Sequence, residues 1–177
     1  MGDIADLQGA VEELLNASAD ALDTIPVFDP TLEGAPERQV ITAGQPVMDC
    51  CDQLAATATQ VLDAPLAPGG LAAGRKIAGK INQVAMAVTI TRCYPMPDEN
   101  GQPPTADEQT EAARQINADG WALWNHLYNM WRADLLFTFC DELFFDGMRP
   151  LGPSGGCAGW VLQIRISLDG YEETFST

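Results

Sequence analysis

The pentapeptide Gly152-Pro153-Ser154-Gly155-Gly156 has the G-x-S-x-G pattern of a serine hydrolase, in which the serine lies in a sharp turn between a strand and a helix. The segment after it alternates apolar and polar residues from Trp160 to Leu168, which predicts a half-buried strand instead of a helix. In such hydrolases the histidine follows the serine, whereas His126, the single histidine of this chain, precedes it. We therefore interpret these glycines as turn residues that lead into the last strand.

A second pattern, over residues 74–80, has the glycine and lysine spacing of a phosphate-binding loop. Ile81 stands where that motif needs a hydroxyl for magnesium, and a strand is predicted to follow instead of a helix. The segment is also a cluster of basic residues in an otherwise acidic chain, which favours docking onto an acidic neighbour over nucleotide binding. The basic residues are Arg75, Lys76 and Lys80.

The remaining reactive residue types do not form a recognisable catalytic or metal-binding pattern. Asp134 and Asp141 are seven residues apart on an expected helix, about 10 Å, which is too far for the carboxylate pair of a retaining glycosidase. The five cysteines include no C-x-x-C pair, so reduced thiols are favoured over a metal site. His126 has no sequence-visible partner and is interpreted as structural. We therefore predict no enzyme activity, no cofactor and no metal.

The composition is that of a folded protein with an acidic surface. The 177 residues are 46% hydrophobic and 19% charged, which suits a single domain, 1–177, with a substantial core. The net charge of −16 disfavours specific binding to DNA or to anionic lipid. The sequence has no apolar run of about 18 residues and no signal-peptide pattern at its start, so we expect a soluble protein made in the cytoplasm, without a membrane partner.

The hydrophobic periodicity predicts helices and strands in the order helix, strands, helix, strand. We expect an α+β fold of the α/β sandwich type: a mostly antiparallel sheet of about four strands, flanked by an N-terminal helix and a long helix. A flexible arm, 26–38, and a flexible loop, 64–80, are rich in proline or glycine, and the loop joins two strands as a long-armed hairpin. The expected N-terminal helix covers 3–23, and the expected strands cover 38–43, 51–62, 84–93 and 160–168.

The long helix begins at a capping box, Thr105-Ala-Asp-Glu108, and its apolar pattern continues to Gly147. Beyond Trp121 apolar residues occur on nearly every face, although Gly120 is expected to bend the helix. One face would meet the sheet and another a neighbouring subunit, so aromatic residues of this helix are candidate interface residues together with the basic loop. The candidate interface residues are Trp124, Trp131, Phe144, Phe145, Arg75, Lys76 and Lys80.

Four short motifs occur in an order that resembles the tail terminator proteins of long-tailed, siphovirus-type actinobacteriophages. They are Asp49-Cys-Cys-Asp-Gln-Leu54, Thr91-Arg-Cys-Tyr-Pro95, Pro97-Asp-Glu-Asn-Gly-Gln-Pro-Pro104, and the run from Pro150 to Trp160. Together they cover about residues 39–170. The resemblance rests on the order in which the four motifs occur.

The resemblance implies a structural subunit that assembles as a homo-oligomeric ring, typically a hexamer, in the phage neck. The ring would cap the tail tube protein, end tube growth and provide the surface on which the head-tail connector or stopper protein docks. The implied location is the virion, after assembly in the host cytoplasm. Genome DNA would pass through the lumen without specific binding, and we expect acidic side chains to face that lumen because they repel DNA.

Three alternatives remain open at the level of sequence. The chain could be another neck or tail ring component, such as a head completion protein or the tube subunit. It could be a small serine hydrolase that uses Ser154. It could also be a small-molecule carrier that binds ligand at its aromatic helix.

Overall fold

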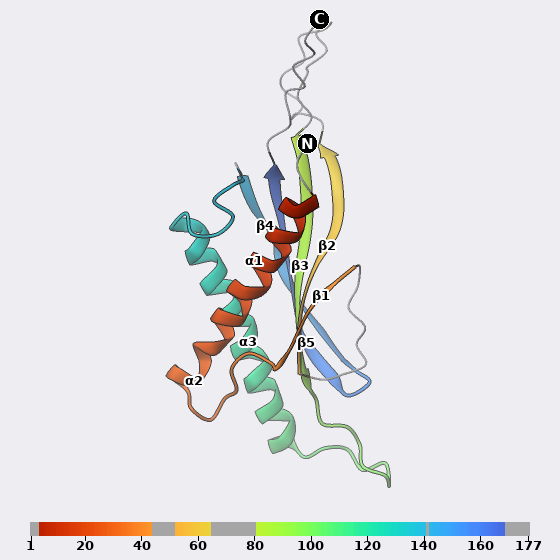
Figure 1. The fold of residues 1–177 in the computed structure, drawn as a ribbon. Coiled ribbons are helices and arrows are strands. Elements are labelled where there is room, and N and C mark those ends of the chain that lie inside the picture. Colours follow the sequence, from red (N-terminus) through yellow and green to blue (C-terminus); the bar gives the residue numbers. More distant parts are fainter. Residues whose placement is uncertain (1–3, 44–51, 65–80, 141, 169–177) are drawn as a thin grey trace, which may run out of the picture.

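The fold is α+β: two helices of substantial length pack on one five-stranded, mostly antiparallel sheet (Figure 1). A computed structural model describes residues 4–43, 52–64, 81–140 and 142–168. The helices are α1 (Ile4–Asp23), α2 (Ile25–Phe28) and α3 (Ala106–Arg132). The strands are β1 (Arg38–Thr42), β2 (Gln53–Ala64), β3 (Ile81–Cys93), β4 (Glu142–Ser154) and β5 (Cys157–Leu168).

The sheet has the strand order β1-β2-β3-β5-β4, in which β1 runs parallel to β2 and every other pair is antiparallel. The long-armed hairpin is confirmed, because β2 pairs with β3 as far as Ala64 and Ile81. Ala64, the first residue of the predicted loop 64–80, belongs to β2, and 65–80 lie outside the described residues. The sheet has five strands instead of about four because β4 comes from a segment that the sequence assigned to the long helix.

The core lies between the sheet and a single layer formed by α1 and α3. Alternate residues of the central strands point into it, as the period of a half-buried strand requires. Both helices contact the sheet and each other, and α1 is the more deeply enclosed of the two, since nine of its described residues are buried and only five of α3 are. The fully buried side chains include Leu14, Leu22, Leu54, Met86, Ile90, Leu123, Leu127, Leu162, Ile164 and Ile166.

The long helix begins as predicted but ends earlier than predicted. The Thr105 hydroxyl accepts a hydrogen bond from the Glu108 backbone N–H, and the Glu108 carboxylate accepts one from the Thr105 backbone, which completes the capping box. The helix ends at Arg132 instead of Gly147, and the positive φ angles of Asp134 and Phe137, both 53°, turn the chain toward β4. Within one subunit the buried positions of α3 form one stripe, and burial of a second face against a neighbouring subunit stays a prediction. That stripe is Ile116, Asp119, Gly120, Leu123 and Leu127.

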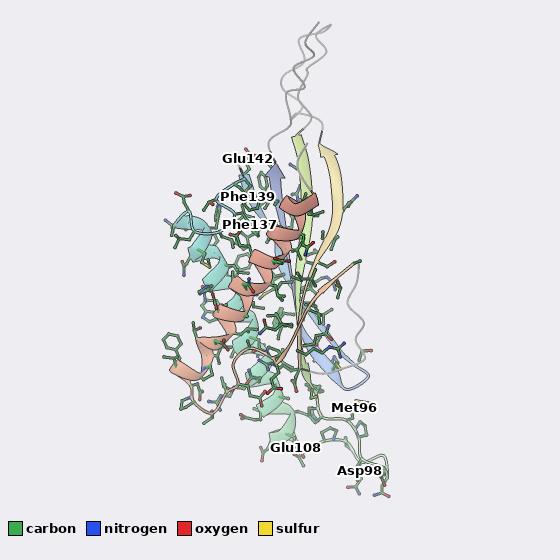
Figure 2. The ribbon with its side chains drawn as sticks, viewed as in Figure 1. Met96, Asp98, Glu108, Phe137, Phe139 and Glu142 are labelled. Atoms are coloured by element: carbon green, nitrogen blue, oxygen red, sulfur yellow. The ribbon has the colours of Figure 1, made fainter. Side chains whose placement is uncertain are left out.

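The connection between α3 and β4 is anchored to the core by Phe137. Its ring is buried, and its backbone N–H donates to the carboxylate of Glu13 on α1 at 2.6 Å. Figure 2 shows Phe137 and the half-exposed Phe139 near Glu142, where β4 begins. The composition of Leu135–Phe139 is compatible with a helix, which explains the prediction. In the structure, tertiary contacts hold this run in a loop.

The glycine-rich segment is a hairpin turn, as predicted, but a shorter one. Strand β4 extends to Ser154 and β5 begins at Cys157, so two residues make the whole connection. Gly155 and Gly156 have φ angles of 58° and 78°, the left-handed conformation that a two-residue hairpin turn requires at both positions. Residues 150–159, which lie between the expected end of the long helix and the expected strand 160–168, are therefore mostly strand.

The arm 26–38, which the sequence predicts to be flexible, lies against the body of the protein. It contains α2, and its backbone is held by side chains from other elements. Glu33 and Gln115 exchange two hydrogen bonds, from the Glu33 N–H at 2.8 Å and to the Glu33 carbonyl at 3.1 Å. The buried guanidinium of Arg92 also donates to the carbonyl of Gly34. These polar contacts join residues that are far apart in the sequence, so no sequence pattern predicts them. The prediction of flexibility rests on the glycine and proline content of the arm.

Candidate subunit interface

Three of the predicted interface residues meet in an aromatic cluster between α3 and β4. Trp124, Tyr128 and Trp131 follow one another along α3 at spacings of four and three residues, which places them on one stripe. The ring of Phe145, from β4, lies 5.5 to 5.9 Å from each of these three rings. The cluster is partly buried and lies beside β4, which forms one edge of the sheet.

Phe144 and Phe145 point to opposite faces of the sheet because they are consecutive residues of a strand. Phe145 faces α3, whereas Phe144 is 40% exposed on the face that no described helix covers. The Arg165 guanidinium lies over the Phe144 ring, 5.6 Å from its centroid. Arg165 also donates to both carboxylate oxygens of Asp146. The expectation that both phenylalanines belong to one helix is therefore wrong.

The basic residues of the candidate interface, Arg75, Lys76 and Lys80, lie outside the described residues. The structure thus brings together Trp124, Trp131 and Phe145, and it separates Phe144 from them.

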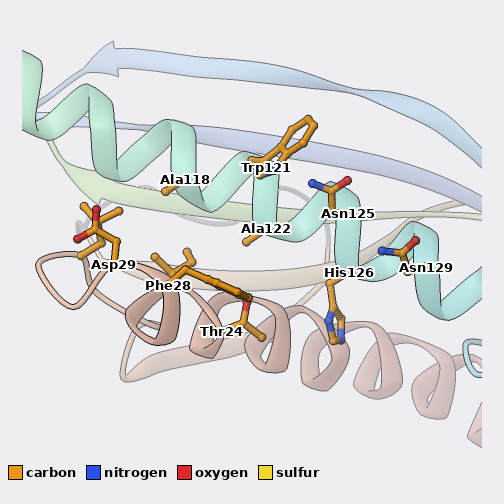
Figure 3. A pocket seen from close by; sticks show the side chains of 11 residues that line it. Thr24, Phe28, Asp29, Ala118, Trp121, Ala122, Asn125, His126 and Asn129 are labelled. Atoms are coloured by element: carbon orange, nitrogen blue, oxygen red, sulfur yellow. The ribbon is translucent and has the colours of Figure 1, made fainter.

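A hollow that sequence reasoning missed lies between α2 and the middle of α3, with a volume of about 620 Å³ (Figure 3). Two aromatic side chains at its rim are strongly exposed, Phe28 at 85% and Trp121 at 70%. His126 lines the same hollow, so its position is on the α1–α2 side of α3 and not beside the Ser154 turn. The exposed Trp121 was not separable from Trp124 and Trp131 by spacing alone, because all three suit one broad apolar face.

A smaller hollow, about 260 Å³, lies next along α3 and is lined by carboxylates of three segments, Glu33, Asp52 and Glu111. Its floor includes Arg92, which makes a two-point ion pair with the buried Asp119 at 2.9 and 3.0 Å. Burial raises the pKa of Asp119 above its usual value, against the opposing effect of the Arg92 hydrogen bonds. This pair holds α3, β3 and the arm together, and we interpret it as structural.

The described residues contain no group of three or more histidine, cysteine or acidic side chains that could hold a metal ion. Within the same residues, no helix is long and apolar enough to cross a membrane. Ser154 precedes a turn and a strand, without the following helix that a nucleophile elbow requires.

Neither a protein-family model nor a curated protein sequence matches this chain. The geometry of its surfaces and the order of its sequence motifs therefore carry the functional argument.

Proposed function

We propose that this protein is a structural subunit of a phage neck, a tail terminator that forms a homo-oligomeric ring, caps the tail tube and joins it to the head connector. The observation that carries this proposal is the aromatic cluster of Trp124, Tyr128, Trp131 and Phe145, which remains partly exposed beside a sheet edge. Aromatic residues that stay partly exposed beside an open edge are typical anchors of protein interfaces. The order of the four sequence motifs supports the choice of a tail terminator among ring proteins.

The two sides of the subunit also differ, as a ring requires. A head-to-tail ring needs two different surfaces on each subunit that meet and close by rotation. One side offers the aromatic cluster at the β4 edge, and another offers the hollows between α3 and the arm. This asymmetry favours a ring over a two-fold dimer, whose interface would use the same patch twice.

The strand β4 is poorly suited to add a further strand at its edge. A bulge at Gly147 shifts its register against β5, and Pro150 and Pro153 have no backbone N–H to donate. We therefore expect subunits to meet through side chains of the aromatic cluster and not by continuous strand pairing over the length of β4.

Electron microscopy of the purified protein, with and without tail tubes, tests the proposal. A terminator should stop at a single ring and bind one end of each tube, whereas a tube subunit should polymerise without limit. Stacked tubes grown from the protein alone, or a monomer that leaves tube ends uncapped, would contradict the proposal. A ring reconstruction would also test the expected acidic lumen, and a predominantly basic lumen would contradict that part.

A direct test of the catalytic alternative uses a fluorophosphonate probe on the wild type and on Ser154→Ala. We expect no labelling of either protein, because Ser154 lies in a hairpin. Labelling that disappears in the variant would instead establish a serine hydrolase.

A further inference from the structure

The two hollows described above follow one another along α3, with the hydrogen bonds between Gln115 and the Glu33 backbone at the acidic one, and we treat them together as one furrow. The residues of α3 that line it recur every three or four positions, so they share one face of the helix. The arm provides the opposite wall, from Phe28 to Glu33. We call this feature the α3 furrow. Its α3 wall comprises Glu111, Ala112, Gln115, Ala118, Trp121, Ala122, Asn125, His126 and Asn129.

One end of the α3 furrow is apolar and the other is acidic. The apolar end has the small residues Ala118 and Ala122 as its floor and the exposed rings of Phe28 and Trp121 at its rim. Exposed aromatic rings that border an apolar hollow are typical of binding sites. Asn125 and Asn129 add side-chain amides, for which no hydrogen bond is found among the described residues.

The acidic end carries an excess of negative charge after its internal ion pairs are counted. Arg92 pairs with Asp119 and, at 3.4 Å, with Glu33. Arg114 pairs with Asp29 and, at 3.6 Å, with Glu111. With Asp52, five carboxylates share these two guanidinium groups, so the charge of three carboxylates is not compensated, and three carboxylates line the hollow itself. They are Glu33, Asp52 and Glu111, with Glu33 and Glu111 side chains 73% and 62% exposed.

We propose that the α3 furrow binds the segment 65–80 of a second copy of this chain. That segment contains three basic residues and no acidic one, so its charge complements the three carboxylates. It also contains Leu71 and Ile77, bulky aliphatic residues that suit the apolar end. In a chain of net charge −16, this is a segment that can approach another copy without repulsion.

The chain's own segment cannot reach the acidic end of its own furrow. It leaves the fold between Ala64 and Ile81, at the far end of the β2–β3 hairpin (Figure 1). Asp52 lies next to the opposite end of β2, which spans 12 residues or roughly 40 Å at about 3.3 Å per residue. Sixteen residues that must go out and return reach about 26 Å at the same rise. The occupant therefore has to come from another copy.

A synthetic peptide of residues 65–80, labelled with fluorescein, tests the contact by fluorescence anisotropy. The receptor is the full chain with Arg75→Gln, Lys76→Gln and Lys80→Gln, so that its own segment does not occupy the furrow of a neighbour. We expect saturable binding that weakens at least about tenfold when the receptor also carries Glu33→Gln and Glu111→Gln. A receptor with Trp121→Ser tests the apolar end and should lose affinity to a similar extent.

The matched control carries Glu12→Gln and Glu142→Gln, which remove the same charge from exposed positions outside the furrow. We expect this control to bind the peptide as its parent receptor does, and circular dichroism should show that all receptors are folded. No binding of the peptide would overturn the proposal. An equal loss in the control and in the furrow variant would also overturn it, because the attraction would then be general charge.

This inference rests on the self-association that the proposed function requires. Different experimental results would contradict the inference and the proposed function. If electron microscopy shows a ring but the peptide does not bind the furrow, the furrow contact is overturned and the proposed ring stands. Furrow-dependent peptide binding by a protein that forms no ring would overturn the terminator function and leave the contact between copies.

Discussion

At the scale of single residues, Gly120 determines how closely α3 approaches the sheet. The Trp160 indole lies against this glycine and donates a hydrogen bond from Nε1 to the carbonyl of Ile116 at 2.8 Å. A Cβ atom at Gly120 would lie 2.6 Å from that same Nε1. The helix is continuous through this position, and Gly120 makes room for the Trp160 ring.

We predict that Gly120→Ala destabilises the protein by about 1 to 3 kcal/mol in urea denaturation, although alanine is the better helix former. The gain in helix propensity, about 1 kcal/mol, is outweighed because the indole or the helix must move. The matched control is Gly9→Ala on α1, where a Cβ would meet nothing within 4 Å. That variant should be as stable as the wild type or up to about 1 kcal/mol more stable. Equal stability of the two variants would contradict the close contact.

The adjacent Phe144 and Phe145 should respond differently to truncation. Phe145→Ala removes the ring on which three others pack, and we predict a loss of about 2 to 4 kcal/mol in the free energy of unfolding. Phe144→Ala removes an exposed ring that contacts Arg165, with a predicted loss of about 1 kcal/mol or less. Denaturant titration of both variants provides the measurement. A larger loss for Phe144→Ala would contradict the assignment of faces.

At the scale of elements, the capping box of α3 predicts a pH dependence. Hydrogen bonds from the backbone and side chain of Thr105 hold the pKa of Glu108 below its usual value of 4.5. A carboxylate with a lowered folded pKa stabilises the fold at neutral pH, and this contribution is lost as the pH falls through that lowered pKa. We therefore predict that Glu108→Ala is less stable than the wild type at pH 7 and that the difference shrinks progressively below pH 4.5.

Thermal unfolding of both proteins between pH 7 and pH 3 measures this difference. Glu111→Ala, one turn along the same helix, is a suitable control because its carboxylate caps no backbone group. A difference between wild type and Glu108→Ala that stays constant across this pH range would show that the carboxylate does not cap the helix.

At the scale of the whole molecule, the two central strands should be the last part to open. Strand β3 is paired along its length with β2 and β5, and its inward side chains are buried. We predict that amide hydrogen exchange is slowest in β3 and β5 and faster in β1, a five-residue edge strand with exposed side chains. Mass spectrometry of peptic fragments provides the measurement. Exchange in β3 as fast as in β1 would contradict a sheet with β3 at its centre.

Much of the fold could be predicted from the sequence because its signals are local. The alternation of Met86, Val88 and Ile90 placed β3, and Thr105 with Glu108 placed the start of α3. The α+β class followed from the order of these elements. The end of α3 could not be predicted, because the run after Arg132 is rich in large apolar residues and shows no clear period that separates a helix from a strand.

The candidate site was predictable in part. The aromatic residues of α3 were correctly singled out, but whether they meet each other, the sheet or solvent depends on which strand lies beside them. Phe145 lies in the cluster because its position on β4 faces α3. Phe144 lies outside the cluster because adjacent positions of a strand face opposite sides of the sheet. The α3 furrow depends on segments that are about 90 residues apart, and nothing in the sequence relates Phe28 to Trp121.

By itself, the sequence determined α1, the capped start of α3, four of the five strands, the excess of negative charge, and the turn chemistry of Gly155 and Gly156. Only the tertiary structure decided where the long helix stops, which rings are exposed, and which carboxylates share a hollow. The physical reason is that hydrophobic periods and capping bonds act within a few residues, whereas burial and electrostatic proximity depend on segments that folding brings together.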